Sequence, residues 1–195
     1  MADFDKAFKL TMGHEGGYSH DPDDPGGETY KGVARDRHPT WKGWIVIDGK
    51  KSQPNFPKNL DGDDDLQDCI KDFYKLKFWD PLCGDIIPDD DIAIEMFDTG
   101  VNMGTYQASK FLQQTLNLLN REGHLYSDIV EDGDVGKNTI KSLNTLLSYD
   151  PPELVLLWLN IFQGARYASI TGNNPRLEKY MRGWSKRLKV VKQYG

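Results

Sequence analysis

The chain of 195 residues has few cysteines, no long hydrophobic run and a deficit of positive charge. Its two cysteines, Cys69 and Cys83, lack the spacing of zinc ligands, so we expect free thiols in a chain made in the cytoplasm, although a pairing between them stays open. The most apolar run, residues 154–162, is interrupted by Asn160 and is far shorter than the ~20 residues that cross a bilayer. We therefore expect no membrane insertion.

Acidic residues outnumber basic ones by 30 to 24, which gives a net charge of −6. Residues 1–91 carry −8 and residues 92–195 carry +2. An acidic front half lacks the basic footprint that a phosphate backbone requires, so we expect no nucleic-acid partner. The N-terminus begins acidic and has no apolar core of a secretory signal, so we expect synthesis in the cytoplasm without a signal peptide.

Apolar residues recur at helical spacing through most of the chain, which predicts a mainly α fold with minor β. Asp3 is positioned to cap a first helix that continues to Glu15, before Gly16 and Gly17 stop it. The stretch 44–47, which reads WIVI, predicts a short strand, and residues 19–27 are too rich in Pro, Gly and Asp for regular structure. Further helices are predicted from 65, from 89 to 104, from 105, around 140–147, and from about 151 and 174 onward.

A composition shift near residue 88 is the one candidate domain boundary. It divides the chain into residues 1–88, which carry the motif described next, and residues 89–195, which are predicted to be almost entirely helical. No Pro-, Gly- or Ser-rich linker separates the two segments, so we expect them to pack into a single globular body.

Glu15 is the sharpest candidate for catalysis. At the C-terminal end of the predicted helix and at the margin of its apolar face, the dipole and burial would both disfavour its charged form and raise its pKa, as a general acid requires. The alternative is an ordinary exposed Glu. Asp24 and Thr29 follow closely in the sequence. Hydrolysis of a glycosidic bond requires at least two carboxyl groups, one protonated and one ionised. The alternative for Asp24 is a role in a turn.

The stretch 15–33, which reads EGGYSHDPDDPGGETYKGV, closely resembles the signature of glycoside hydrolase family 108, the N-acetylmuramidases of phage endolysins and bacterial secretion-activator proteins. The later segments 97–104, 111–113, 132–139 and 183–187 resemble the predicted peptidoglycan-binding region that accompanies that family. The resemblance implies a lysozyme-like fold, cleavage of the β-1,4 bond between N-acetylmuramic acid and N-acetylglucosamine, no cofactor, and Glu15 as the catalytic acid.

The spacing of Glu15, Asp24 and Thr29 is also similar to the Glu, Asp and Thr triad of phage-type lysozymes, with the Thr one position earlier. On this reading Asp24 stabilises the oxocarbenium-like transition state or, with Thr29, orients the attacking water. Retention or inversion at the anomeric carbon, and hydrolase or transglycosylase products, stay open.

Four more residues are candidates for substrate binding. Tyr18 and Tyr30 flank the acidic loop and are predicted to stack on sugar rings, with core packing as the alternative. Asp98 and Asn102, four residues apart on one helix, either line the groove or cap neighbouring loops. No metal site is predicted, because the acidic run at 61–65 lacks the Gly and the bidentate Glu of a calcium loop.

The sequence therefore predicts a monomeric muramidase that acts on peptidoglycan glycan strands, with a holin or a dedicated export system as the route to the wall, in the periplasm or outside. Phage lysis and bacterial secretion are not distinguished. The alternative is a non-catalytic peptidoglycan-binding or secretion-accessory protein on a lysozyme-like scaffold.

Overall fold

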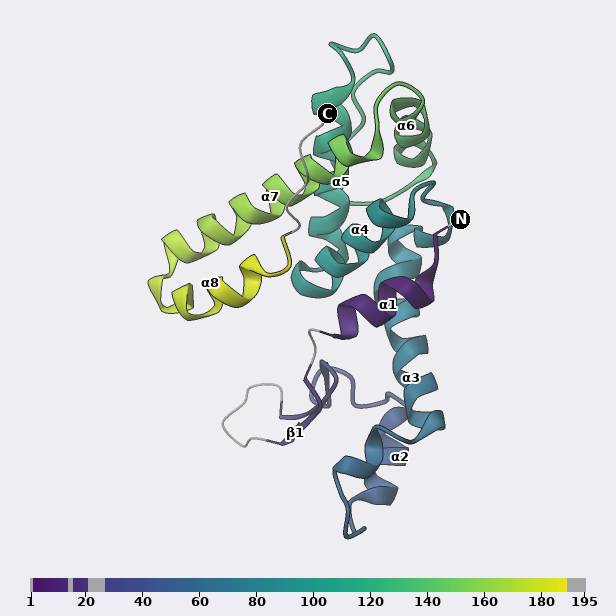
Figure 1. Cartoon of the computed structure of the whole chain (residues 1–195), viewed down its shortest axis with the longest axis vertical. Helices are drawn as coiled ribbons and strands as arrows, with labels where there is room; N and C mark the ends of the chain where they lie inside the picture. Colours follow the sequence, from purple (N-terminus) through teal and green to yellow (C-terminus); the bar gives the residue numbers. More distant parts are fainter. Residues whose placement is uncertain (1, 14–15, 21–26, 189–195) are drawn as a thin grey trace. The chain divides into compact units, whose positions relative to one another are not determined.

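The structure is a computed structural model and describes residues 2–13, 16–20 and 27–188. These residues are mainly helical, with one small sheet (Figure 1). The chain divides into two compact units, residues 8–77, called the small unit, and residues 1–7 together with 78–195, called the large unit. The division at residue 88 and the single globular body stay predictions, and each unit is described by itself.

Helix α1 (Phe4–Met12) begins where the sequence predicts. The Asp3 carboxylate accepts hydrogen bonds from the backbone N–H groups of Asp5 (2.9 Å) and Lys6 (3.2 Å), which satisfies donors that the first helical turn leaves open. The helix ends at Met12, and Gly13, the poorest helix former after proline, lies in a turn. The prediction that it continues to Glu15 is therefore wrong.

Three short antiparallel strands follow in the small unit: β1 (Tyr18–His20), β2 (Glu28–Tyr30) and β3 (Val33–Ala34), in the order β1-β2-β3. Tyr18 pairs with Tyr30, Ser19 with Thr29, and His20 with Glu28. Strand β1 occupies part of a segment predicted to be irregular, because β2 offers it a partner that the local sequence does not reveal.

The predicted strand at 44–47 is also wrong, since these residues belong to helix α2 (Gly43–Lys50). Trp44 and Ile47 are 3% and 0% exposed, whereas Ile45 is 76% exposed, so burial follows a helical period and not alternation. A Cβ on Gly43 would overlap the Trp41 ring, so only glycine admits that ring against the start of the helix. Tertiary packing overrides the β propensity of the Ile-Val-Ile run.

Helix α3 (Asp64–Tyr74) completes the small unit, after a 3-10 turn at Lys58–Leu60. A π-helical turn, Lys75–Trp79, follows α3 and includes the last residues of the small unit and the first residues of the large unit after it. The core of the small unit consists of buried residues from β2, β3, α2, the 3-10 turn and α3: Tyr30, Val33, Trp44, Ile47, Leu60, Leu66, Ile70 and Tyr74.

The large unit contains α4 (Asp90–Met103), α5 (Thr105–Leu119), α6 (Lys137–Leu147), α7 (Pro152–Asn173) and α8 (Glu178–Ser185). Short 3-10 turns at Asp80–Leu82, Gly84–Ile86 and Pro175–Leu177 connect them. Helix α4 packs against α5 and α7, and α8 folds back along α7 (Figure 1). Helix α4 begins at residue 90 and ends before Gly104, as predicted, and α5 begins at residue 105, also as predicted.

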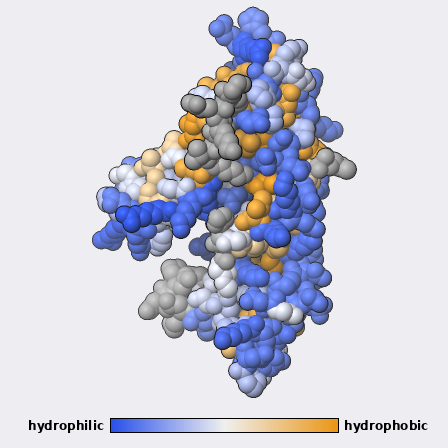
Figure 2. All heavy atoms as spheres, in the orientation of Figure 1, coloured by the Kyte–Doolittle hydropathy of each residue, from blue (hydrophilic) through white to orange (hydrophobic). Residues whose placement is uncertain are grey.

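Burial differs sharply along these helices. The centre of α4 is almost fully enclosed, and Phe97 packs edge-on against Phe4 and Trp79 with ring centroids 5.7 and 5.8 Å apart. Helix α8 has no buried residue. In Figure 2 hydrophobic side chains gather along α7, whereas the neighbouring α8 is mostly hydrophilic. No helix of the described chain is both long and apolar enough to cross a membrane.

Candidate active site

The small unit frames the segment that holds the predicted catalytic residues. Glu15 and Asp24 lie outside the described residues. Their neighbours are described: β1 starts at Tyr18, and the pairing of His20 with Glu28 fixes both ends of the connection that contains Asp24. The Lys31 N–H donates to the carbonyl of Gly17 (3.3 Å), which ties the chain after Glu15 to the turn that follows β2.

Thr29 lies at the centre of the sheet, paired with Ser19 of β1 on one side and with Ala34 of β3 on the other. Successive strand residues point to opposite faces, so Thr29 faces away from its buried neighbours Glu28 and Tyr30. Thr29 is partly exposed. Of the three predicted catalytic residues it is the one whose position the structure describes, and its role stays a prediction.

Tyr18 lies opposite Tyr30 and is half-buried. Its ring meets Phe56 edge-to-face with centroids 4.7 Å apart. Burial and a hydrogen bond to the Glu28 carboxylate raise the pKa of the Tyr18 hydroxyl, so it is a neutral donor. These contacts fix the ring orientation, and its role as a sugar platform stays a prediction.

Glu28 is the residue that sequence reasoning missed. Its side chain is 6% exposed and lies 2.6 Å from Nε of Arg35 and 2.9 Å from Nζ of Lys51. Arg35 also makes a two-pronged contact with Asp48 (2.7 and 3.1 Å) and lies over the Trp44 ring at 4.3 Å. The network joins β2 to helix α2. The one sequence signal is the alternation of Glu28 with Tyr30, which places both on the buried face of a strand.

The charge state of this network follows from its contacts. Burial alone raises the pKa of Glu28, but hydrogen bonds from Lys51 and Tyr18 and the charges of Arg35 and Lys51 outweigh it and hold the pKa below its ordinary value. Glu28 is thus an ionised carboxylate that is held between two cations. It suits the role of an anchor for β2 and not that of a proton donor.

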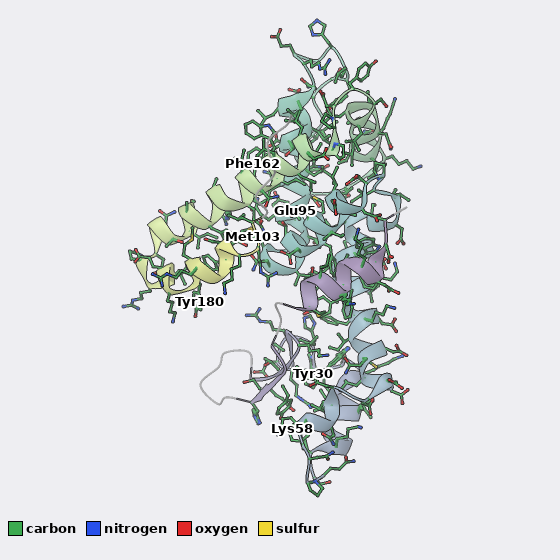
Figure 3. All side chains as sticks on the ribbon, in the orientation of Figure 1. Tyr30, Lys58, Glu95, Met103, Phe162 and Tyr180 are labelled. Atoms are coloured by element: carbon green, nitrogen blue, oxygen red, sulfur yellow. The ribbon has the colours of Figure 1, made fainter. Side chains whose placement is uncertain are left out.

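Tyr30 is placed differently from its prediction. It is 1% exposed, and it is seen among the side chains of the small unit in Figure 3. Its hydroxyl accepts a hydrogen bond from Nε2 of Gln67 (3.0 Å) and lies 3.4 Å from the Leu60 carbonyl, and burial raises its pKa to about 12. A ring buried in this way offers no face to a sugar, so the alternative of core packing applies and Tyr30 is left out of the proposed site.

Asp98 and Asn102 lie on α4, in the large unit, and both contact the C-terminal part of the chain. Asp98 pairs with Arg187 (2.8 Å), and the two side chains are 13% and 10% exposed. Asn102 accepts a hydrogen bond from the Tyr167 hydroxyl (2.7 Å) and borders a pocket of about 150 Å³ beside Trp184. Both therefore hold α4 to α7 and to the segment after α8. A role in substrate binding stays a prediction.

The acidic run at 61–65 caps a helix in this structure. The Asp63 carboxylate accepts the N–H of Leu66 (2.8 Å) at the start of α3 and pairs with Lys50 (2.6 Å). Both contacts lower its pKa, the ion pair first. Within the described ranges no group of three or more His, Cys, Asp or Glu side chains is arranged to hold a metal ion.

Comparisons with known proteins agree with this architecture. Residues 8–104 match the model of the family described as glycosyl hydrolase 108, and residues 107–189 match a predicted peptidoglycan domain. No curated protein sequence matches the chain. Among solved structures the chain is similar to the Brucella abortus SagA structure, with 22% identity, a TM-score of 0.61, and coverage of 95% of this chain and 88% of that one.

Together these findings define a mainly α, lysozyme-like protein of the peptidoglycan-directed glycoside hydrolase class, and the predicted fold class is confirmed. The two matches occur in the order that the sequence motifs predict. The chain belongs to the glycosyl hydrolase 108 family, and a predicted peptidoglycan domain follows its hydrolase region.

Proposed function

We propose that this protein is an N-acetylmuramidase that hydrolyses the β-1,4 bond between N-acetylmuramic acid and N-acetylglucosamine in peptidoglycan. The observation that carries the proposal is that Glu15, Asp24 and Thr29 all lie within the region that matches the glycosyl hydrolase 108 model, on a chain that continues into a predicted peptidoglycan domain. Thr29 is held at the centre of a sheet, Glu15 precedes the first strand of that sheet in the sequence, and Asp24 lies between β1 and β2.

In the proposed mechanism Glu15 protonates the leaving glycosidic oxygen. Asp24 stabilises the positive charge that develops on the sugar ring or, together with Thr29, orients the attacking water. The ion network of Glu28, Arg35 and Lys51 takes no part in proton transfer and fixes the strand that carries Thr29. A rigid strand keeps the Thr29 hydroxyl in one place. This position matters because a small displacement of a catalytic group lowers the reaction rate strongly.

Digestion of purified peptidoglycan by the wild type and by Glu15→Gln, followed by borohydride reduction and mass spectrometry of the fragments, tests this proposal. We expect fragments that end in reduced N-acetylmuramic acid, released at least about a hundredfold more slowly by the variant. Thr29→Val provides a graded comparison, with a smaller loss if the hydroxyl only orients water. Near-wild-type release by Glu15→Gln contradicts the assignment of the acid.

Two other outcomes redirect the proposal. Anhydro ends on the fragments identify a lytic transglycosylase that uses the same acid. Folded, wall-bound protein that releases nothing identifies the alternative, a non-catalytic peptidoglycan-binding or secretion-accessory protein. NMR of the anomeric proton during the first turnovers separates retention from inversion.

A further inference from the structure

The large unit contains a broad groove outside the region that matches the hydrolase model. It has a volume of about 990 Å³ and lies between α6 and the segment 125–136 that precedes that helix. One wall comes from α6 and the other from the preceding segment, and Gln113 of α5 also borders the groove. The size falls in the range of sites that enclose a small organic ligand or a short peptide.

Side-chain hydrogen bonds from α5 hold one wall of the groove, the segment that precedes α6, in place. Gln113 donates to the Asp132 carboxylate (2.7 Å) and to the Asp134 carbonyl (2.9 Å), and it accepts the N–H of Gly133 (2.8 Å). The Asn117 side-chain amide donates to the Ile129 carbonyl (2.9 Å) and accepts the Ile129 N–H (2.9 Å). A groove fixed in this way loses little conformational entropy when a ligand enters.

Two residues with hydroxyl groups, Thr139 and Ser142, border the groove. Thr139 is 3% exposed and Ser142 is 5% exposed, so packing holds both side chains in place. Hydroxyl groups held in place beside a groove can donate hydrogen bonds to a ligand and accept them from it.

The same end of the groove attracts negative charge. Helix α6 starts at Lys137 after Gly136, which has no side chain to cap it, so the first N–H groups of the helix are open. Lys137 and Lys141 lie one turn apart on this helix, and both border the groove. Open N–H groups, two ammonium groups and the Thr139 hydroxyl form a site for a carboxylate.

The opposite wall carries the complementary charge. Asp128, Asp132 and Asp134 all border the groove from the preceding segment. The one aromatic residue among the described groove residues is Tyr126, whose hydroxyl donates to the Leu116 carbonyl (2.9 Å) and whose pKa is raised to about 12 by burial and by Asp150. A groove without an exposed aromatic platform and with opposite charges on its walls suits a peptide that carries both charges better than a sugar chain.

We propose that this groove binds the peptide stem of peptidoglycan, through carboxylates at the α6 end and an ammonium group at the acidic wall. The choice of ligand rests on the proposed function; the site itself rests on the groove. The hydrolase region would then cleave the glycan while the groove binds the peptide attached to it.

Calorimetry on the full chain tests the proposal with two probes, the synthetic tetrapeptide L-alanyl-γ-D-glutamyl-meso-diaminopimelyl-D-alanine and the sugar chitotetraose. We expect the tetrapeptide to bind and the sugar not to bind at the groove. Thr139→Val, which keeps the side-chain shape, and Lys141→Gln are each expected to weaken tetrapeptide binding at least tenfold. Amidation of the peptide carboxylates is expected to have the same effect.

Lys179→Gln, on the exposed surface of α8, is the matched control and is expected to change the affinity less than twofold. Circular dichroism checks that each variant is folded. Failure of the folded wild type to bind the tetrapeptide at millimolar concentration overturns the proposal, as does unchanged binding by both groove variants. Glycan hydrolysis is measured on the same samples, so its loss with retained peptide binding counts against the proposed function alone, and the reverse counts against the groove alone.

Discussion

At the scale of single residues, burial separates groups that the sequence presents as equivalent. Glu28 and Thr29 are neighbours, yet one is 6% exposed inside an ion network and the other points to the opposite face of the sheet. Tyr18 and Tyr30 both flank the acidic loop, yet only Tyr18 retains partial exposure. Strand alternation explains the first difference. The second depends on the residues packed around each ring.

Replacement of Glu28 tests its role as an anchor. Glu28→Gln leaves Arg35 and Lys51 facing a neutral amide, and because both cations are partly exposed we expect a loss of about 2 kcal/mol in the free energy of unfolding, below the 3–5 kcal/mol of a fully buried pair. Urea unfolding at pH 7 measures this loss. Asp36→Asn, a nearby acidic residue on the surface, is the control, with an expected change under about 0.5 kcal/mol. Equal stability of the two variants would contradict the anchoring role.

At the scale of elements, caps and partners decide where helices and strands begin and end. Asp3, Asp63 and Asp89 each cap the helix that follows, and two of these helices begin where the sequence predicts. Residues 44–47 show the opposite case. Their β-branched side chains favour a strand locally, but Trp44 and Ile47 reach the core together only from a helix.

The cap of α4 provides a test at this scale. The Asp89 carboxylate accepts the N–H of Ile92 (3.0 Å), so Asp89→Ala removes that bond and an anion at the positive end of the helix dipole. We expect a loss of about 1 kcal/mol, measured by thermal or urea unfolding. Asp91→Ala, an exposed residue in the same first turn, removes a charge but no cap and serves as the matched control. A loss of the same size in both variants would assign the effect to the dipole alone.

At the scale of the whole molecule, charge is distributed unevenly between the units. The carboxylates of Glu28, Asp48 and Asp63, all in the small unit, are held below their ordinary pKa by lysine and arginine partners. In the unfolded chain these groups take up protons at about pH 4, whereas in the folded chain they resist protonation to lower pH. Their stabilisation is therefore complete above the unfolded pKa values and is lost as the pH falls through the folded ones.

We accordingly expect acid to destabilise the small unit first. Between pH 6 and pH 3, hydrogen exchange should lose protection in residues 27–77 before residues 90–170. Glu28→Gln should reduce the pH dependence of the small unit, since the variant has one linked proton fewer. Earlier loss of protection in the large unit would show that other groups dominate acid unfolding.

The sequence by itself determined the family, the largely helical content and the positions of most helices, because these depend on local motifs, periodic apolar residues and caps. Only the tertiary structure decided that 44–47 is helical, that Tyr30 is enclosed, that Asp98 pairs with Arg187, and that Glu28 anchors the strand beside Thr29. Each of these depends on contacts between residues distant in the chain or on which face is buried. The groove at α6 is of the same kind, since its two walls meet only after folding.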